Sequence, residues 1–246
     1  MTHDPATAQE FYTKALGWTF RPGFRREEQG YHLALAEGGL PVAGMGMTAR
    51  TTGFSASWTT YFRVDSANDM ANRIRDHGGT VAVGPMAFGT GRVAWAADRQ
   101  DARFGVWEGA PVPGWRMQRR HGAPARLQLH TGDAFGAAMF YGAVFSWDSH
   151  APDRLGVRFE ADHVVVSVDG HHAADLWGGA VDKAPDPTIR PQWHVYFCVD
   201  DVDAVAERAA SAGGSVVREP HASYFGRVAD LRDPEGALFH ITSEND

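Results

Sequence analysis

Polar side chains alternate with apolar ones along two predicted strands in the second half of the chain. Residues 193–199 read Trp-His-Val-Tyr-Phe-Cys-Val, so His194 and Tyr196 share one strand face and the apolar residues share the other. The strand over residues 126–131 has the same pattern, with the polar residues Arg126, Gln128 and His130. Burying unpaired polar groups is costly, so these faces are predicted to line a wet or liganded cavity. Imidazoles there could bind a metal, and the guanidinium could bind an oxyanion.

An internal repeat indicates which elements position these side chains. Trp58–Trp107 aligns with Trp193–Thr242 at an offset of 135 residues without a gap, and 19 of 50 positions are identical. The segments Asp4–Trp18 and Asp133–Trp147 align at an offset of 129 residues. The chain is therefore built of four modules, in which the first resembles the third and the second resembles the fourth. A duplication is the simplest explanation.

The modules are predicted to share one order of elements, which is a strand, a helix and three further strands. The fourth module is expected to contain the strand Trp193–Val199, the helix Val202–Ala212 and the strands Ser215–Arg218, Gly226–Leu231 and Ala237–Thr242. The first module opens directly on its helix after Asp4-Pro5, so it lacks the first strand. Either that strand lies upstream of Met1, or a partner or another segment covers the incomplete sheet edge. The fold class is predicted to be α+β.

The length of 246 residues suits two units of about 120 residues each, a usual domain size. A Pro- and Gly-rich stretch at residues 109–114, followed by residues 115–124, is the only credible linker, and it is expected to be a packed crossover segment. The sequence therefore predicts a first domain over residues 1–114, a linker over 115–124 and a second domain over 125–246.

Composition restricts the partners and the compartment. The chain has 23 basic and 30 acidic side chains, a net charge of −7 and no long basic run, which argues against nucleic acid or an anionic membrane as a partner. A single cysteine, Cys198, excludes an internal disulfide and suits a reducing cytoplasm. No apolar run could span a bilayer. A cytoplasmic protein with a small-molecule ligand or substrate is expected, and a homodimer if the open sheet edge needs cover.

Several short motifs recur at matching places in the modules. They are Phe11-Tyr12 with Gly17-Trp18 in the first helix, Val199-Asp200-Asp201 at a helix start, the Gly213-Gly214 turn and Asp233-Pro234-Glu235-Gly236 before the last strand. In these features the chain resembles the vicinal oxygen chelate superfamily, which includes glyoxalase I, fosfomycin and bleomycin resistance proteins, and extradiol dioxygenases. It is similar in particular to tandem glyoxalase-like proteins of actinomycetes that are often labelled hydroxylases. The resemblance implies modules paired into two cup-shaped mixed sheets with the helices outside.

The resemblance also implies positions for metal ligands, because the family takes them from the first and last strands of each module. In the fourth module these positions, here called slots, are His194, seven residues before Asp201, and His240, seven residues after Asp233. The corresponding slots of the third module are Arg126 and Asp175. Asp175, His194 and His240 would then bind a divalent metal such as Fe, Mn, Ni or Zn. The resemblance assigns Arg126 and Tyr196 to catalysis and Gln128, His130 and Trp177 to ligand binding.

The first half of the chain lacks such ligands. Its slots are Gly44, Thr59 and Gly105, so no metal is predicted there. The polar strand face of Thr59, Tyr61 and Arg63, with Trp95 and Trp107 nearby, is predicted either to bind an aromatic ligand or to belong to the core.

A pair of adjacent histidines, His171-His172, resembles a metal-binding motif. Neighbouring residues on a regular strand point to opposite faces, so the pair is predicted to be a hairpin tip without a functional role.

Two functions remain open. One is a glyoxalase- or dioxygenase-like metalloenzyme, a lyase, isomerase or dioxygenase, that acts on a small oxygenated substrate in the second domain. The other is a metal-free protein that binds, or confers resistance to, an aromatic natural product or antibiotic. In that case Arg126 and Asp175 could form a buried ion pair, and no cofactor would be present. This scaffold hosts both functions, so fold resemblance alone does not choose between them.

Overall fold

The computed structural model describes residues 1–23, 30–47, 49–50, 53–145, 155–160, 163–168, 170–178 and 191–244. The chain forms two compact units. Unit 1 comprises Met1–Trp58, Pro111–Arg126 and Val195–Asp246, and unit 2 comprises Thr59–Ala110 and Leu127–His194. No helix among the described residues is both long enough and apolar enough to cross a membrane.

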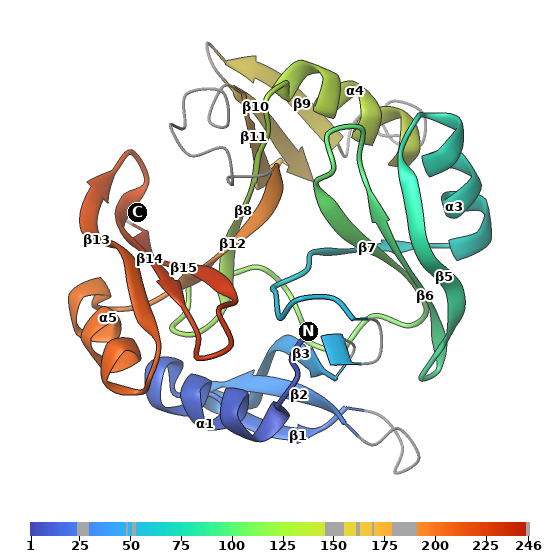
Figure 1. The fold of residues 1–246 in the computed structure, drawn as a ribbon. Helices are drawn as coiled ribbons and strands as arrows, with labels where there is room; N and C mark the ends of the chain where they lie inside the picture. The colour runs from blue at the N-terminus through green and yellow to red at the C-terminus, as the bar shows by residue number, and fades with distance from the viewer. Residues whose placement is uncertain are drawn as a thin grey trace. The chain divides into compact units, whose positions relative to one another are not determined.

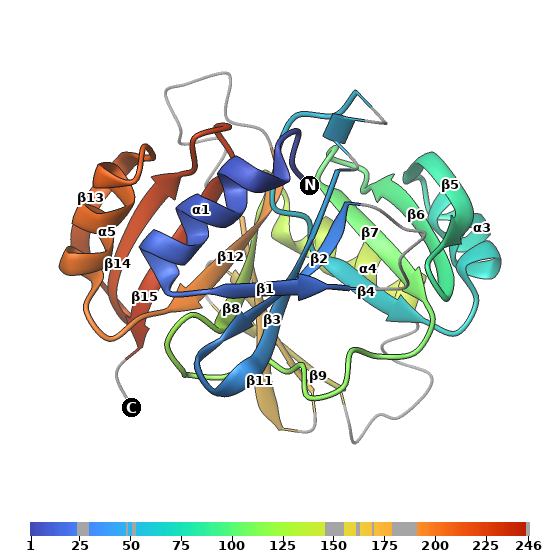
Figure 2. The same ribbon diagram turned by 90° about the horizontal axis from the view of Figure 1, so that it is seen from below.

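Unit 1 combines the first and the fourth modules. Its helices are α1 (Pro5–Leu16) and α5 (Val202–Ser211), which lie next to each other (Figures 1 and 2). An antiparallel three-stranded sheet has the order β1 (Thr19–Pro22), β2 (Tyr31–Ala36) and β3 (Leu40–Gly46), with a 3-10 turn η1 (Glu37–Gly39) before β3. The other strands of the unit run in the order β13 (Ser215–Ser223), β14 (Gly226–Arg232), β15 (Leu238–Glu244) and β12 (Gln192–Cys198).

Unit 2 combines the second and the third modules. Its helices are α3 (Ala67–Asp76) and α4 (Ala134–Phe145) (Figure 1). A four-stranded sheet has the order β4 (Tyr61–Val64), β7 (Arg103–Glu108), β6 (Gly91–Ala97) and β5 (Thr80–Phe88). Its remaining strands run in the order β8 (Pro124–His130), β11 (His171–Trp177), β10 (His163–Val168) and β9 (Leu155–Glu160). The strands β8 and β12 each run from one unit into the other.

The sheets are mixed, which confirms the predicted α+β class. In each complete module the first strand pairs with the last strand in parallel, as in β4 with β7, β8 with β11 and β12 with β15. The successive pairs β5–β6, β9–β10 and β13–β14 are antiparallel hairpins. A parallel pair needs a crossover connection, and in every complete module that connection contains the helix.

Local signals explain where the helices begin and end. Asp4 caps the start of α1 by accepting hydrogen bonds from the backbone N–H groups of Ala6 and Thr7, and Pro5 occupies the first helical position. Gly17 ends this helix with a φ of 70°, a left-handed conformation that glycine adopts without a Cβ penalty. Asp201 caps the start of α5 by accepting the backbone N–H of Ala204.

Each unit has its own apolar core. The largest fully buried residues of unit 1 include Phe11, Leu16, Trp18, Phe197, Leu231 and Phe239. The core of unit 2 includes Ile74, Phe104, Leu129, Tyr141, Leu176 and Trp193. The apolar face predicted for residues 193–199 is therefore confirmed, since Phe197 packs in unit 1 and Trp193 packs in unit 2.

A buried hydrogen-bond network ties the first module to the fourth in unit 1. The Trp58 indole N–H donates to the Tyr12 hydroxyl over 2.8 Å, and that hydroxyl donates to Asp233 over 3.0 Å. The other Asp233 oxygen accepts the backbone N–H groups of Glu235 at 3.0 Å and Ala237 at 2.9 Å. Burial raises the pKa of Asp233 above its ordinary value and raises that of Tyr12 much further.

Unit 2 repeats this network with the equivalent residues of the second and third modules. The Trp193 indole donates to the Tyr141 hydroxyl over 3.0 Å, and Tyr141 donates to Asp98 over 3.1 Å. Asp98 accepts the backbone N–H groups of Gln100 at 2.8 Å and Ala102 at 2.9 Å. Positions that are identical between the repeats therefore make the same contacts.

The compact units divide the chain differently from the predicted domains 1–114 and 125–246. The reason lies in the helices and the networks, because Tyr12 on α1 reaches Asp233 and Tyr141 on α4 reaches Asp98. These contacts join the first module to the fourth and the second to the third. The predicted linker, residues 115–124, belongs to unit 1, where the Trp115 indole N–H donates to the Val42 carbonyl over 3.0 Å.

Candidate functional site

The three complete modules place their slots in one common strand register. In each module the last-strand slot pairs with the residue two positions after the first-strand slot. The observed pairs are Tyr61 with Gly105, Gln128 with Asp175, and Tyr196 with His240. The register is independent of any family resemblance, and it makes Gly105, Asp175 and His240 structurally equivalent positions.

Unit 2 holds a chain of polar side chains around Asp175, which is itself 2% exposed. The Nε2 atom of His172 lies 2.6 Å from Asp175 Oδ1, and the amide of Gln128 donates to Asp175 Oδ2 over 3.5 Å. His130 Nε2 lies 3.2 Å from Gln128 Oε1. The rings of His130 and His194 are 4.2 Å apart, centroid to centroid. The structure thus brings together four of the predicted site residues of this unit and adds His172.

The contact of His172 arises from an irregularity in the strand. Between β10 and β11 the register shifts, so that Ser167 pairs with His172 while Val166 pairs with Ala174. Ala173 is the extra residue of a β-bulge, and a bulge interrupts the alternation of strand faces. His172 and Asp175, three residues apart, therefore reach each other. His171 pairs with Val168 at the end of the β10–β11 hairpin, as predicted, but the bulge, for which the sequence carries no plain signal, brings His172 to Asp175.

Unit 1 holds a second carboxylate–imidazole pair. His240 is 4% exposed, and its Nδ1 atom lies 2.7 Å from Asp230 Oδ1 on the neighbouring strand. Burial alone would raise the pKa of Asp230, but the hydrogen bond and charge of His240, with Arg218, hold that pKa below its ordinary value. In the neutral tautomer that donates Nδ1–H to the carboxylate, Nε2 carries the lone pair of the ring.

Tyr196 and Arg126 extend this group within unit 1. The Tyr196 ring stacks on His240 with centroids 4.6 Å apart. Burial raises the pKa of Tyr196, and the nearby Asp230 raises it further, so the phenol stays protonated and acts as a hydrogen-bond donor. Arg126 is 8% exposed, and its guanidinium carbon lies 4.3 Å from the centroid of the Phe225 ring.

The predicted metal ligands are divided between the units. Asp175 and His194 belong to unit 2, and His240 belongs to unit 1. Within the part of the chain that the structure describes, no three His, Cys, Asp or Glu side chains are grouped as a metal site. The remaining predicted ligand-binding residue of the second half, Trp177, stacks on His163 with centroids 4.2 Å apart and an interplanar angle of 7°.

Two slots of the first half are glycines, Gly105 and Gly44, and each is covered by a tyrosine from a neighbouring strand. A Cβ atom on Gly105 would overlap the Tyr61 ring, and one on Gly44 would overlap the Tyr31 hydroxyl. The Tyr61 hydroxyl in turn accepts the indole N–H of Trp95 over 2.6 Å, and Trp95 is buried. These slots are therefore filled by side chains of the protein itself.

The remaining members of the first half's polar face differ in their surroundings. Arg63 donates through Nε to the Gly109 carbonyl over 3.1 Å, and Trp107 donates to the Ala110 carbonyl over 3.3 Å. Thr59 is half-buried and precedes β4. The structure thus gives Arg63, Tyr61 and Trp107 contacts within unit 2, and it leaves the aromatic-ligand prediction untested.

Replacing Gly105 with alanine is expected to lower the free energy of unfolding by about 1–3 kcal/mol, because the added methyl group displaces the Tyr61 ring and its bond with Trp95. Urea denaturation followed by circular dichroism measures the change. Gly142→Ala is the matched control, since this helical glycine has no atom within 4 Å of its Cβ position. That variant should gain about 0.5–1 kcal/mol. Equal effects at both positions would contradict the packing described for Tyr61.

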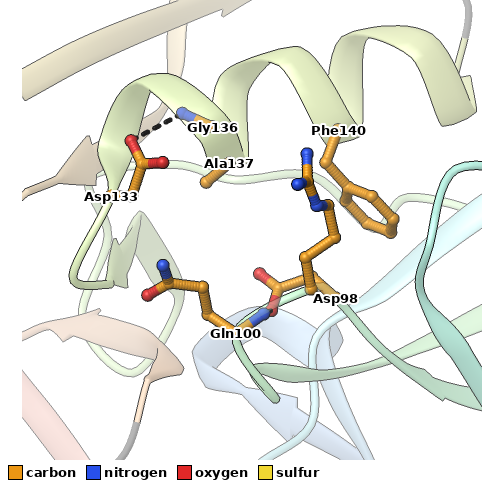
Figure 3. A pocket seen from close by; sticks show the side chains of 7 residues that line it. Asp98, Gln100, Asp133, Gly136, Ala137 and Phe140 are labelled. Atoms are coloured by element: carbon orange, nitrogen blue, oxygen red, sulfur yellow. Dashed lines mark hydrogen bonds between the residues drawn. The ribbon is translucent and has the colours of Figure 1, made fainter.

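A small cavity lies elsewhere in unit 2, at the start of α4 (Figure 3). Its volume is about 110 Å³, and it is lined by Asp98, Arg99, Gln100, Asp133, Gly136, Ala137 and Phe140. Its polar groups already serve the fold, because Asp133 accepts the N–H of Gly136 over 2.8 Å and Gln100 accepts that of Gly132 over 3.0 Å. No predicted site residue lines this cavity.

The sequence of this chain is similar to those of known proteins. Residues 126–242 match a family model described as a glyoxalase-like domain. Over 253 residues the chain is 33% identical to the anthracycline biosynthesis protein DnrV of Streptomyces peucetius, covering 97% of this chain and 88% of the relative.

Solved structures show the same fold. The Mn(II)-bound glyoxalase from Novosphingobium aromaticivorans superimposes with a TM-score of 0.55 at 17% identity, covering 98% of this chain and 79% of the other. The 2,3-dioxygenase LapB from Pseudomonas sp. KL28 gives a TM-score of 0.55 at 13% identity, covering 99% and 89%. At these identities the likeness concerns the fold alone.

Proposed function

Because the chain belongs to the vicinal oxygen chelate superfamily, we propose that it is an enzyme acting on a small oxygenated substrate, with a divalent metal bound by Asp175, His194 and His240. The observation that carries the proposal is the 2.7 Å contact of His240 Nδ1 with Asp230. Metal-binding histidines almost always donate their second ring N–H to a carboxylate, carbonyl or water, which fixes the ring and directs the other nitrogen to the metal. The name of the relative DnrV suggests aromatic natural products of the anthracycline class as the first substrates to test.

The side chains of Asp175, His194 and His240 are chemically suited to bind such a metal. Two neutral imidazoles and one carboxylate suit Fe, Mn, Ni or Zn and leave coordination positions for substrate oxygens. When bound, the metal would supply Lewis-acid polarisation of those oxygens. The other residues have roles of their own. Asp230 holds the His240 ring, Arg126 can bind an oxyanion, and Tyr196 can donate a hydrogen bond from its protonated phenol.

A metal-free binding protein is the second candidate, and the contacts of Asp175 favour it. Asp175 Oδ1 lies 2.6 Å from His172 Nε2, and Asp175 Oδ2 accepts from the Gln128 amide over 3.5 Å, so both oxygens of this carboxylate already have partners in the chain. Under this alternative, the polar chain of His172, Asp175, Gln128 and His130 lines a binding surface for an aromatic natural product.

The deciding measurement is the metal content of the untagged protein, purified without chelator, beside the double variant His194→Ala/His240→Ala. The proposal expects close to one metal per chain in the wild type and almost none in the variant. The matched control, His3→Ala/His121→Ala, removes two imidazoles outside the candidate site and should keep the metal.

Two results would reject the metalloenzyme. One is the absence of metal in the wild type after reconstitution with Fe, Mn, Ni and Zn. The other is an equal loss of metal in both double variants. The metal-free binding protein would then be the function to pursue, by titration with aromatic natural products.

A further inference from the structure

The turn between β13 and β14 presents two adjacent aromatic side chains, Tyr224 and Phe225, here called the aromatic tip. Tyr224 is 63% exposed, which makes it one of the most exposed large side chains among the described residues. The two rings are 4.7 Å apart and nearly perpendicular, at 83°. Exposing an aromatic surface in this way gives no folding stabilisation, because it leaves apolar area in water.

A buried cation lies against the aromatic tip. Arg126, on β8, places its guanidinium carbon 4.3 Å from the Phe225 centroid and 5.6 Å from the Tyr224 centroid. Its Nη1 donates to the Tyr224 hydroxyl over 3.3 Å. The protein therefore holds a phenolic oxygen, which belongs to an exposed residue, on the guanidinium of an arginine that is itself only 8% exposed.

The internal repeat shows that the hairpin does not need these aromatic residues to form. At the offset of 135 residues, Tyr224 and Phe225 correspond to Gly89 and Thr90. The first copy nevertheless makes the same hairpin, β5–β6, which resumes at Gly91 as β14 resumes at Gly226. The aromatic tip is thus an addition to one copy, next to the one first-strand slot that carries an arginine.

Aromatic contacts continue from the tip to the candidate site in unit 1. The rings of Phe225 and Tyr196 are 5.4 Å apart at 90°, and Tyr196 stacks on His240. A flat ring held at the tip would therefore be linked to His240 through Phe225 and the buried ring of Tyr196. Edge-to-face and stacked arrangements of this kind favour a planar aromatic partner.

We propose that the aromatic tip and Arg126 form a subsite for a planar aromatic ring that carries a phenolic or phenolate oxygen. The ring packs against Tyr224 and Phe225, and its oxygen accepts the Arg126 N–H that the Tyr224 hydroxyl accepts in the free protein. This inference rests on the proposed function for the existence of a small oxygenated substrate, and it names the class of that substrate.

The test is a fluorescence titration of the full-length protein with 2-naphthol, a planar phenol with one oxygen that cannot chelate a metal. The variant Tyr224→Gly/Phe225→Thr carries the tip of the first copy and is expected to fold, because β5–β6 forms with those residues. Its Kd should rise about 10-fold or more, since it loses the ring contacts. Phe135→Thr/Phe159→Thr is the matched control, because it removes another pair of exposed, contacting rings and should leave the Kd unchanged.

A second comparison measures how much the phenolic oxygen contributes to binding. Wild-type protein should bind 2-naphthol about 10-fold more tightly than naphthalene, because a hydrogen bond from a charged donor adds roughly that much. Arg126→Met should lose this preference while still binding naphthalene. Equal affinities of wild type and tip variant for 2-naphthol, or no preference for it over naphthalene, would overturn the subsite.

The metal content of the tip variant separates this inference from the proposed function. A wild-type metal content with weak 2-naphthol binding is the expected result. Absence of metal from the wild type with intact 2-naphthol binding would reject the metalloenzyme and keep the subsite.

Discussion

Replacing Asp233 with alanine is expected to lower the free energy of unfolding by about 3–5 kcal/mol, because three donors in a buried site lose their acceptor. These donors are the Tyr12 hydroxyl and the backbone N–H groups of Glu235 and Ala237. Asp233 is only 7% exposed, so little water reaches the site to replace the carboxylate. Urea denaturation at neutral pH, followed by circular dichroism, measures the loss.

Two further variants test the cause of this loss. Asp203→Ala is the control, because its carboxylate is exposed and pairs only with the exposed side chain of Arg227, so it should change stability little. The double variant Asp233→Ala/Tyr12→Phe should be less destabilised than the sum of its single changes, since both remove the same hydrogen bond. A loss below about 1 kcal/mol for Asp233→Ala would mean that the network does not hold unit 1 together.

Removing Asp230 is expected to weaken metal binding by about 10- to 100-fold if His240 is a ligand, because partners of this kind orient the imidazole and raise its basicity. The carboxylate lies 2.7 Å from His240 Nδ1. Competition with a chromophoric chelator, using Mn or Zn and Asp230→Ala protein, gives the change in Kd. The metal affinity of Asp230→Asn should fall between those of the wild type and Asp230→Ala. The asparagine amide oxygen still accepts the His240 N–H but carries no charge.

The matched control for Asp230→Ala is His172→Ala, which changes the partner of Asp175, the other carboxylate that contacts an imidazole. His172→Ala removes an imidazole that contacts Asp175 Oδ1 and that would compete with a metal for that oxygen. The metal affinity of this variant should therefore stay the same or rise. A fall in affinity for His172→Ala together with no change for Asp230→Ala would contradict the proposed ligand set.

The repeat made most of the fold predictable. Identical positions such as Trp58 and Trp193, or Asp98 and Asp233, mark places where the two copies need the same contact, and the structure uses them in the same network. Alternation along residues 193–199 also placed Trp193 and Phe197 in the core, although His194 and Tyr196 on the other strand face are buried too. These signals are local, because they depend on spacing within one strand or one turn.

Contacts that depend on an irregular strand or on distant modules were not predictable in this way. His172 reaches Asp175 only because of the bulge at Ala173, which has no distinctive residue type. Tyr61 and Tyr31 cover the glycine slots from neighbouring strands, and the register that brings them there is a property of the sheet. The grouping of modules followed from helix packing, whereas the sequence showed only which modules are alike.

Unit 1 combines segments that are far apart in the chain, and this affects the order in which the chain can fold during synthesis. Unit 2 consists of residues 59–110 and 127–194, so all of its parts exist once residue 194 has left the ribosome. Unit 1 joins residues 1–58 to residues 195–246, and Tyr12 meets Asp233 only after some 220 further residues have been added. At roughly 5–20 residues per second, α1 waits about 10–45 seconds for its partners in the fourth module. Unit 2 can therefore be completed before unit 1, although residues 1–58 of unit 1 precede it in the chain.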